Sequence, residues 1–385
     1  MHSSEAEALA GFVTLDAIRH AAGVIAGAVV RTPLLPFGRP EPGDTLGRTK
    51  VTLKPESLQP IGAFKLRGAY YNIATLPEER RAAGVVAHSS GNHAQGVARA
   101  ARLLGVRAVI VMPDDAPRVK VDRVREDGAE IVFVGPDSEE RANRAAEIAE
   151  RDGLSMVAPY DDVATITGQG TVGLEIVEQI AQIEGREGRD GRDADPRDGD
   201  PRDGDPRDGD PRDGDPRDGG SGAEPTPLTV LVPVGGGGLA AGVCIAVKSL
   251  RPDARVIGVE PELAADGRAS LAAGHVVTWP SEKVGGTIAD GQRTAHVGQI
   301  PFAIFRRHLD AIVAVGEDEI ARAMVRAARE TRLVLEPSGA TTLAAWLFHE
   351  SEIAAAGRVV CILSGGNVDP VLYRALLDRG EAAGG

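Results

Sequence analysis

The segment Thr229-Val-Leu-Val-Pro-Val-Gly-Gly-Gly-Gly-Leu239 joins a β-branched run, four consecutive glycines and the start of an Ala-rich stretch that extends to Leu250. A strand, a glycine turn and a helix in this order present free backbone N–H groups at a helix N-terminus, where an anion is stabilised. No Lys-Ser or Lys-Thr follows Gly235–Gly238, so the segment is not a nucleoside-triphosphate P-loop, and its spacing is not Gly-x-Gly-x-x-Gly. A flexible hinge is the alternative; the context favours a site for a phosphate monoester.

Outward from this segment, short β-branched runs alternate with helical stretches over most of the 385 residues. This alternation predicts an α/β fold with parallel sheets and helices on both faces. Ligands of such sheets lie beyond the carboxyl ends of the strands, so we expect the chemistry in the loops after strands. The expected strands are Val51–Lys54, Val85–His88, Ala108–Met112, Ile131–Val134, Thr229–Val234, Val256–Glu260, Ala311–Val315 and Val359–Leu363. The expected helices are Lys65–Leu76, Asn92–Leu104, Pro117–Asp127, Ser138–Arg151, Gly170–Ile183, Leu239–Leu250, Asp318–Arg332 and Ser338–His349.

The composition limits the partners and the compartment. The formal net charge is -13, which argues against the basic face that a nucleic acid or an anionic membrane requires. Cys244 and Cys361 are the only cysteines, too few for a disulfide framework or a zinc cluster. Because this usage suits a reducing compartment and Met1–Gly11 lacks a secretory signal pattern, we expect a cytoplasmic protein without nucleic-acid or membrane partners.

A tandem repeat interrupts the alternating pattern. The unit Asp-Pro-Arg-Asp-Gly occurs five times between Asp195 and Gly219, with a Pro and a Gly in every copy and no apolar residue. Such a composition cannot bury enough surface to offset the entropy of ordering, so residues 185–225 are expected to form a disordered loop. A tether for a metal or a partner is the less favoured alternative, since the acids lack the spacing of a calcium-binding loop.

Lys65 is a candidate nucleophile. It ends the run Gln59-Pro-Ile-Gly-Ala-Phe-Lys65, where the loop after a strand passes into a helix. A helix N-terminus disfavours positive charge, which lowers the pKa of an amine there and favours the neutral form that Schiff-base chemistry needs. Taken alone, a solvated surface lysine is the more frequent situation.

Two further loops after predicted strands carry small polar residues. Ser89-Ser90-Gly91-Asn92-His93 offers hydroxyl, amide and backbone N–H donors to a carboxylate, although an ordinary helix cap would use the same residues. His93 could act as a general base, but a histidine in such a position is more often a packed polar side chain. Ser364-Gly365-Gly366-Asn367 would bring a hydroxyl and bare backbone close to a ring, or form a plain turn.

A third loop contains two carboxylates. Glu260 ends a predicted strand, and Asp266 follows in the loop. With a backbone carbonyl and waters, these two acids could hold a divalent cation; two solvated acids are an equal alternative.

Taken together, the motifs resemble those of the fold-type II pyridoxal-phosphate enzymes, in the branch of the threonine and serine dehydratases and the serine racemases. They occur in the family's order over nearly the whole chain. Several motifs in one order are a specific indication of the family, whereas any single motif is a weak one. Ala63 stands where many members have Ser. The matching segments are Arg31–Leu34, Lys54–Lys65, His88–His93, Gly168–Thr171, Pro233–Gly238, Thr287–Gly291, Glu336–Gly339 and Leu363–Asp369.

The resemblance implies catalytic and cofactor-binding roles. Lys65 would attach pyridoxal 5′-phosphate as a Schiff base and act as the base at the substrate Cα, and Ser90 would face that carbon from the opposite side. The cofactor would be bound by Phe64 beside the pyridine ring, Asn92 at the ring hydroxyl, Gly235, Gly236, Gly237 and Gly238 at the phosphate, and Ser364 at the ring nitrogen.

The resemblance also implies residues for the substrate and for a metal. Ser89, Ser90, Asn92 and His93 would lie near the substrate carboxylate, and Arg141 near the second carboxylate of a dicarboxylic ligand. Glu260, Asp266 and the carbonyl of Ala264 would hold Mg²⁺ or another divalent cation.

The implied architecture is two three-layer, parallel-sheet α/β domains like those of the tryptophan synthase β-subunit, in a homodimer. Residues 1–79 and 161–385 would form the larger domain, and residues 80–160 a smaller mobile domain. The expected reaction converts a small hydroxy amino acid, L-threonine or L-serine, into a 2-oxo acid and ammonia. Serine racemisation and 3-hydroxyaspartate dehydration would use the same site and stay open. A non-catalytic amino-acid-binding homologue is disfavoured because Lys65 and Ser364 are both present.

Overall fold

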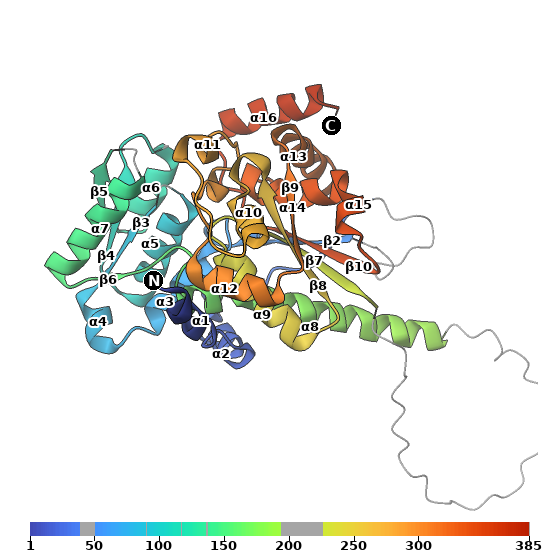
Figure 1. The fold of residues 1–385 in the computed structure, drawn as a ribbon, viewed down its shortest axis with the longest axis horizontal. Coiled ribbons are helices and arrows are strands. Elements are labelled where there is room, and N and C mark those ends of the chain that lie inside the picture. Colours follow the sequence, from blue (N-terminus) through green and yellow to red (C-terminus); the bar gives the residue numbers. More distant parts are fainter. Residues whose placement is uncertain (39–50, 90, 117, 136–137, 194–225, 385) are drawn as a thin grey trace, which may run out of the picture.

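The computed structural model describes residues 1–38, 51–89, 91–116, 118–135, 138–193 and 226–384 (Figure 1). The Asp-Pro-Arg-Asp-Gly repeat and Ser90 lie outside these residues, so the predictions made for them are not tested.

The larger sheet has the strand order β1-β2-β10-β7-β8-β9 and is parallel except for the β1–β2 pair. Its centre joins distant parts of the chain, because β2 pairs with β10 in a register that sets Val51 beside Val359. The carboxyl ends of its parallel strands therefore meet at one edge, where the loops after β2, β7, β8 and β10 converge. The strands are β1 (Leu35–Pro36), β2 (Val51–Pro55), β7 (Leu228–Pro233), β8 (Arg255–Pro261), β9 (Ala311–Val315) and β10 (Arg358–Leu363).

The smaller sheet has the parallel order β5-β4-β3-β6. Its strands are β3 (Val85–His88), β4 (Ala108–Pro113), β5 (Glu130–Val134) and β6 (Ser155–Met156). Helices α4 (Glu78–Ala83), α5 (Asn92–Leu104), α6 (Arg118–Glu126) and α7 (Ser138–Asp152) come from the same part of the chain. Domain boundaries at residues 80 and 160, and motion of the smaller part, stay predictions.

Helices cover both faces of the larger sheet (Figure 1). Val230 and Val232 of β7 pack into one apolar cluster with side chains of α8, α9 and α12, while Leu231 between them packs into another with α13 and α14. This alternation is that of a strand buried on both sides, and it confirms the predicted three-layer α/β class. These helices are α8 (Val163–Asp193), α9 (Gly238–Leu250), α12 (Gln299–His308), α13 (Glu317–Thr331) and α14 (Pro337–Phe348).

The remaining helical segments were not all expected. The sequence predicts a helix at α3 (Lys65–Ala74) but not the N-terminal or C-terminal helices or the short turns between strands. Those others are α1 (Ser3–Ala10), α2 (Leu15–Ile25), η1 (Glu56–Leu58), η2 (Glu262–Ala264), α10 (Asp266–Ala273), α11 (Ser281–Gly285), η3 (Asp290–Gln292), α15 (Glu350–Ile353) and α16 (Pro370–Ala382).

Helix α8 corrects one prediction. It begins at Val163, seven residues before the expected start, and continues to Asp193, whereas residues from 185 onward were expected to belong to a loop. No proline interrupts this helix, since the first proline after Val163 is Pro196. The polarity of residues 185–193 therefore did not end the helix.

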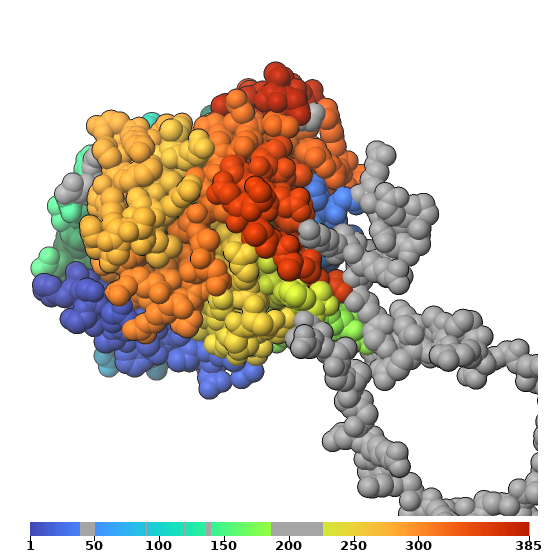
Figure 2. Space-filling view, turned by 45° about the vertical axis from the view of Figure 1, so that its right-hand side comes forward, coloured from blue at the N-terminus to red at the C-terminus, as the bar shows by residue number. Residues whose placement is uncertain are grey.

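The N-terminal helices pack against helices that cover the larger sheet. In the space-filling view the blue N-terminal segment lies against the orange segment that contains α12 (Figure 2), and Glu7 forms ion pairs there with Arg306 and Arg307. Among the described residues no single helix is long and apolar enough to span a membrane; α1 and α2, bent by 65°, pass that test only as a pair.

Candidate active site

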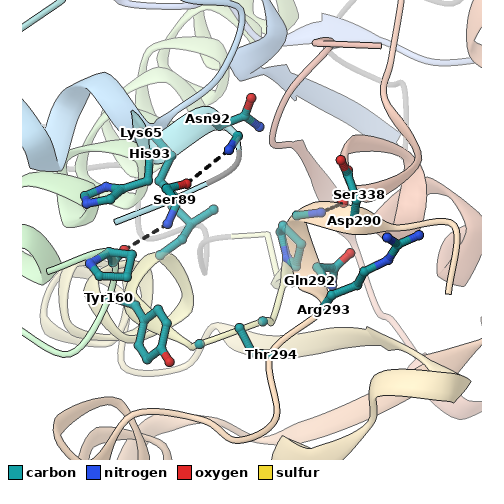
Figure 3. Close-up of a pocket in the computed structure, with 18 of the residues that line it drawn as sticks. Lys65, Ser89, Asn92, His93, Tyr160, Asp290, Gln292, Arg293, Thr294 and Ser338 are labelled. Carbon is teal, nitrogen blue, oxygen red and sulfur yellow. Dashed lines mark hydrogen bonds between the residues drawn. The ribbon is translucent and has the colours of Figure 1, made fainter. Parts of the chain in front are cut away.

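A cavity of about 560 Å³ is lined by residues from both sheets (Figure 3). Loops after β3, β7 and β10 contribute to its wall together with the start of α3, as expected for the carboxyl edge of parallel sheets. Every described residue that was predicted to bind cofactor or substrate lines it: Phe64, Lys65, Ser89, Asn92, His93, Arg141, Gly235, Gly236, Gly237, Gly238 and Ser364. The structure brings these residues together; their individual roles stay predictions.

Lys65 is the first residue of α3 and faces the cavity. Its Nζ donates a hydrogen bond to the carbonyl oxygen of Pro159 at 2.8 Å and lies 5.3 Å from the centre of the Phe64 ring. The side chain keeps some exposed surface toward the cavity, yet protein atoms surround the amine, and this burial lowers the pKa of Lys65 to about 8. The pKa of Lys65 is thus shifted in the direction expected from the sequence, and the cause of the shift is the removal of the amine from water.

The four glycines are fixed by close packing. A Cβ atom on Gly236 would lie 2.2 Å from the ring of Tyr160, and one on Gly237, whose φ is +93°, would lie 2.8 Å from Pro301. Gly238 begins α9, and its Cβ would lie 2.9 Å from the backbone of Tyr160. Because no side chain fits, the cavity wall here is bare backbone at a helix N-terminus, which is the setting expected for a phosphate.

Asn92 belongs to a hydrogen-bonded chain that sequence reasoning did not find. Its Nδ2 donates to Oε1 of Glu336 at 2.6 Å, and its Oδ1 accepts from Nδ2 of Asn367 at 2.8 Å. Arg123 of α6 donates in turn to Asn367 Oδ1. The Glu336 carboxyl is buried, which raises its pKa, and the negative charge of Asp290 raises it further. Glu336 and Asn367 lay within matched motifs, but neither had been assigned a role.

Ser364 places a neutral hydroxyl in the cavity wall. It follows β10, and its Oγ donates to the carbonyl oxygen of Ser338 at 3.2 Å. The backbone N–H of Phe64 donates to the Ser364 carbonyl oxygen at 3.1 Å, which ties this loop to the segment that carries Lys65.

The smaller sheet supplies the opposite wall. Ser89 Oγ accepts a hydrogen bond from the backbone N–H of Gly91 at 3.1 Å. His93 is buried and its Nε2 is 2.8 Å from the Val157 carbonyl oxygen; burial, assisted by the charge of Lys65, lowers the pKa of His93 to about 3. A neutral, packed imidazole is therefore expected at neutral pH. Arg141 lines the cavity near His88, whose pKa is lowered by burial and by the Arg141 charge.

An ion pair at the cavity also escaped sequence reasoning. Lys120 of α6 donates to Oδ2 of Asp290 at 2.5 Å, and both residues line the cavity (Figure 3 labels Asp290). Asp290 lies in the matched segment Thr287–Gly291, so the motif indicates this segment. It does not indicate the partner of Asp290, Lys120, which is 170 residues away in the sequence.

The predicted metal residues lie in another place and fit a cation only in part. Both oxygens of Glu260 already accept backbone hydrogen bonds, from Gly267 at 2.9 Å and Arg268 at 2.8 Å. Asp266 is buried, its pKa is raised to about 7 by burial, and neither carboxylate oxygen has a hydrogen-bond partner. Within the described residues no group of three or more His, Cys, Asp or Glu side chains could hold a metal ion.

Fold and cavity together define an α/β protein that offers one buried amine and one bare-backbone anion cradle to the same ligand. A family model described as "Pyridoxal-phosphate dependent enzyme" matches residues 25–186 and 221–365, and the chain belongs to this family. The residues present fit the cofactor: the amine suits its aldehyde, the glycines suit its phosphate, and the Ser364 hydroxyl is neutral.

The relatives of this chain differ from one another in their named activity. The chain is 36% identical to an L-threonine ammonia-lyase of Thermotoga maritima, over 97% of this chain and 80% of the relative. It is 35% identical to an L-threo-3-hydroxyaspartate ammonia-lyase of Saccharomyces cerevisiae, over 88% and 89% of the two chains. A solved serine racemase from maize shares 33% identity, with a TM-score of 0.76 over 96% of this chain and 99% of that one.

Proposed function

We propose that the chain is a threonine and serine ammonia-lyase. It would use pyridoxal phosphate to remove the β-hydroxyl of L-threonine or L-serine, giving a 2-oxo acid and ammonia. The observation that carries the proposal is the buried Lys65 amine, which shares one cavity with the glycine cradle and the Ser364 hydroxyl. Threonine ammonia-lyases among the relatives support it.

The chain's own groups each contribute one action. The cofactor, when bound, supplies an electron-withdrawing ring that stabilises negative charge at the substrate Cα. Backbone N–H groups of Gly235–Gly238 would bind its phosphate, and Lys65 Nζ would hold it and then take the Cα proton. A neutral Ser364 cannot protonate the ring nitrogen as an acid would, which favours loss of the hydroxyl over transamination.

Substrate orientation would come from the smaller sheet. Ser89 and backbone N–H groups at the start of α5 would bind the α-carboxylate, and closure of residues 80–160 over the cavity would exclude water. If Ser90 delivers a proton to the other face of Cα, the product is D-serine, and the chain is a serine racemase instead. We also propose a homodimer, on the family resemblance alone, which sedimentation of the purified protein tests. A cytoplasmic location is proposed on the cysteine usage.

The function is tested with purified protein supplied in turn with L-threonine, L-serine, D-serine and L-threo-3-hydroxyaspartate. The assay measures 2-oxo acid, ammonia and serine enantiomers. Fast 2-oxobutanoate from L-threonine with little D-serine from L-serine is expected. Predominant D-serine would replace the proposal by racemisation, and no conversion of any substrate would reject it.

A second candidate substrate, 3-hydroxyaspartate, is favoured by the cationic side chain of Arg141 in the cavity. If it is the substrate, Arg141→Met should raise KM for 3-hydroxyaspartate about tenfold to a hundredfold, as expected for a lost charged hydrogen bond. KM for L-threonine should change little. Arg144→Met, on the same helix and paired with Glu147, is the matched control. Equal effects of the Arg141 variant on both substrates would remove this candidate.

The lowered pKa of Lys65 predicts a pH profile for cofactor attachment. Only the neutral amine reacts with the cofactor aldehyde, and the pKa is about 8 instead of 10.5. After removal of the cofactor, the rate of re-attachment should rise about tenfold per pH unit below pH 8 and level off above it. Stopped-flow absorbance after mixing with pyridoxal phosphate measures this rate. A rate that keeps rising to about pH 10 would show an unperturbed lysine.

We further propose that Asp266, Glu260 and the Ala264 carbonyl bind Mg²⁺. The unpartnered carboxylate of Asp266 supports this, since a buried charge requires compensation. Millimolar Mg²⁺ should raise the thermal midpoint of the wild type by a few degrees and leave that of Asp266→Asn unchanged. Glu262→Gln, an exposed acid in the same loop, should keep the response. An equal response in all three proteins would locate the ion elsewhere.

A further inference from the structure

A buried cluster of four charged side chains lies outside the cavity lining, and no step above uses it. Its members are Lys54 of β2, Glu56 of η1, Arg67 of α3 and Glu175 of α8. Lys54, Glu56 and Arg67 have no exposed side-chain surface. Arg67 follows Lys65 by two residues, so the two side chains leave α3 in different directions.

Arg67 is held from two sides. Its Nε and Nη2 donate to Oε2 and Oε1 of Glu56 at 2.7 and 2.8 Å, a two-bond pair that fixes the plane of the guanidinium. Its Nη1 and Nη2 donate to Glu175 at 2.6 and 3.0 Å. Burial opposes charge on Glu56, but the Arg67 guanidinium overcomes it and holds the pKa of that carboxyl below its usual range.

Lys54 completes the cluster through its bond to Glu175. Its Nζ donates to Glu175 Oε2 and to the Thr32 carbonyl oxygen, both at 2.6 Å, and to Gln179 at 3.0 Å. The cluster thus contains two positive and two negative charges. None of its four side chains is among the buried, unpartnered groups found in the described residues.

The position of the Glu56–Arg67 pair in the chain is informative. Glu56 opens and Arg67 closes the stretch that contains the loop before α3, and Lys65 lies two residues from the closing end. The pair therefore joins the two ends of this loop. At the α3 end of the loop, the backbone N–H of Phe64 is bonded to the Ser364 carbonyl oxygen, but Phe64 makes no side-chain cap and the first turn of α3 has no acidic residue.

Close backbone packing leaves the loop end little freedom to shift without strain. A Cβ on Gly96 of α5 would lie 3.2 Å from the carbonyl group of Lys65, and one on Gly168 of α8 would lie 2.8 Å from the Arg67 carbonyl oxygen. The first turn of α3 is thus enclosed between α5 and α8. The two bonds from the Arg67 guanidinium to Glu56 add a direct restraint between α3 and η1.

We propose that the two-bond Glu56–Arg67 pair is a positioning device for the reactive lysine: it closes the loop between residues 56 and 67 and holds the Lys65 amine in its direction toward the cavity. The proposal rests on the proposed function, in which Lys65 carries the cofactor. Arg67 is a positioning residue, since it touches neither the cavity nor its ligand.

Two double substitutions of the holoenzyme test this. Glu56→Gln/Arg67→Met removes the positioning pair and leaves Lys54 with Glu175. Lys54→Met/Glu175→Gln removes one buried charge of each sign as well, but leaves Glu56 with Arg67. The readouts are the thermal midpoint, kcat and KM, and the visible circular dichroism of the bound cofactor per cofactor molecule. That band reports the fixed orientation of an achiral ring attached to Lys65.

Both doubles should lose thermal stability. Only Glu56→Gln/Arg67→Met should lose most of the dichroism band, with kcat lowered by about a hundredfold and KM changed much less, since a small misplacement of a reacting group has that effect. Equal retention of the band in both doubles, or equal loss, would overturn the proposal and leave the cluster a general stabiliser.

A milder variant covers failure of the first double to fold. Arg67→Lys keeps the charge but cannot form two fixed bonds to Glu56, so it should also lose much of the band; an unchanged band would overturn the proposal. The dichroism comparison stays decisive if the wild type binds cofactor but converts no hydroxy amino acid. That result would reject the proposed function but would leave the positioning role of the Glu56–Arg67 pair open to the same test.

Discussion

Replacement of Lys65 by Ala is expected to abolish both the visible absorbance of the bound cofactor and the formation of 2-oxo acid. Lys65 is the first residue of α3, its amine faces the cavity, and burial brings its pKa to about 8. The substitution removes the group that holds the cofactor and the base that takes the Cα proton. Loss of a positioned acid–base group alone lowers a rate by about 10²–10⁴-fold, and the lost attachment adds to this.

Two further variants separate the chemistry of the lysine from its charge. Lys65→Arg keeps a positive side chain at the site but cannot react with an aldehyde at neutral pH, so it should be as inactive as Lys65→Ala. Lys283→Ala removes an exposed lysine beside Trp279 and should behave as wild type. A Lys65→Ala protein that keeps roughly a tenth or more of the wild-type kcat/KM would show that another group carries the cofactor.

What the sequence predicted correctly was local. The glycine run after β7, the lysine at the start of α3 and the serine after β10 are each recognisable from a strand followed by a short motif. Parallel-sheet geometry then brings them to one edge without knowledge of the pairing order. This is why Lys65, Gly235–Gly238 and Ser364 all line the observed cavity.

What the sequence did not predict was pairing between distant segments. Asn92 bonds to Glu336 and Asn367, which are 244 and 275 residues away, and Lys120 bonds to Asp290 across 170 residues. Nothing in the local pattern of any of these residues specifies such a partner. The cause of the lowered pKa of Lys65 was also out of reach, because burial depends on how α3, α5 and the segment at Pro159 assemble.

The contacts of α6 show what those distant pairs add. Lys120 and Arg123 lie one turn apart on α6, beside the smaller sheet, and bond to Asp290 of η3 and to Asn367 in the loop after β10. Glu336, buried beside Asn92, is sensitive to the charges of both Asp290 and Lys120. The two walls of the cavity are therefore joined by hydrogen bonds, and the charges of one of these pairs also act on the Glu336 carboxyl.

Substitution of Gly236 by Ala is expected to weaken cofactor binding strongly. The new Cβ would lie 2.2 Å from the ring of Tyr160, which also lines the cavity, so either the ring or the glycine loop must move. Overpacking of this kind costs roughly 1–3 kcal/mol, which corresponds to about a fivefold to 150-fold weaker affinity for pyridoxal phosphate. Fluorescence titration of the cofactor-stripped protein measures it.

The structure supplies both a control and a rescue for this prediction. Gly23→Ala, in helix α2 with no atom within 4 Å of the added Cβ, should leave cofactor affinity unchanged and stabilise the helix slightly. In Gly236→Ala/Tyr160→Ala the ring that the Cβ would strike is absent, so affinity should recover in part relative to Gly236→Ala. Unchanged affinity in Gly236→Ala would contradict the phosphate cradle assigned to this loop. Loss without recovery in the double variant would mean that the methyl group blocks the phosphate directly, with Tyr160 having no part in the effect.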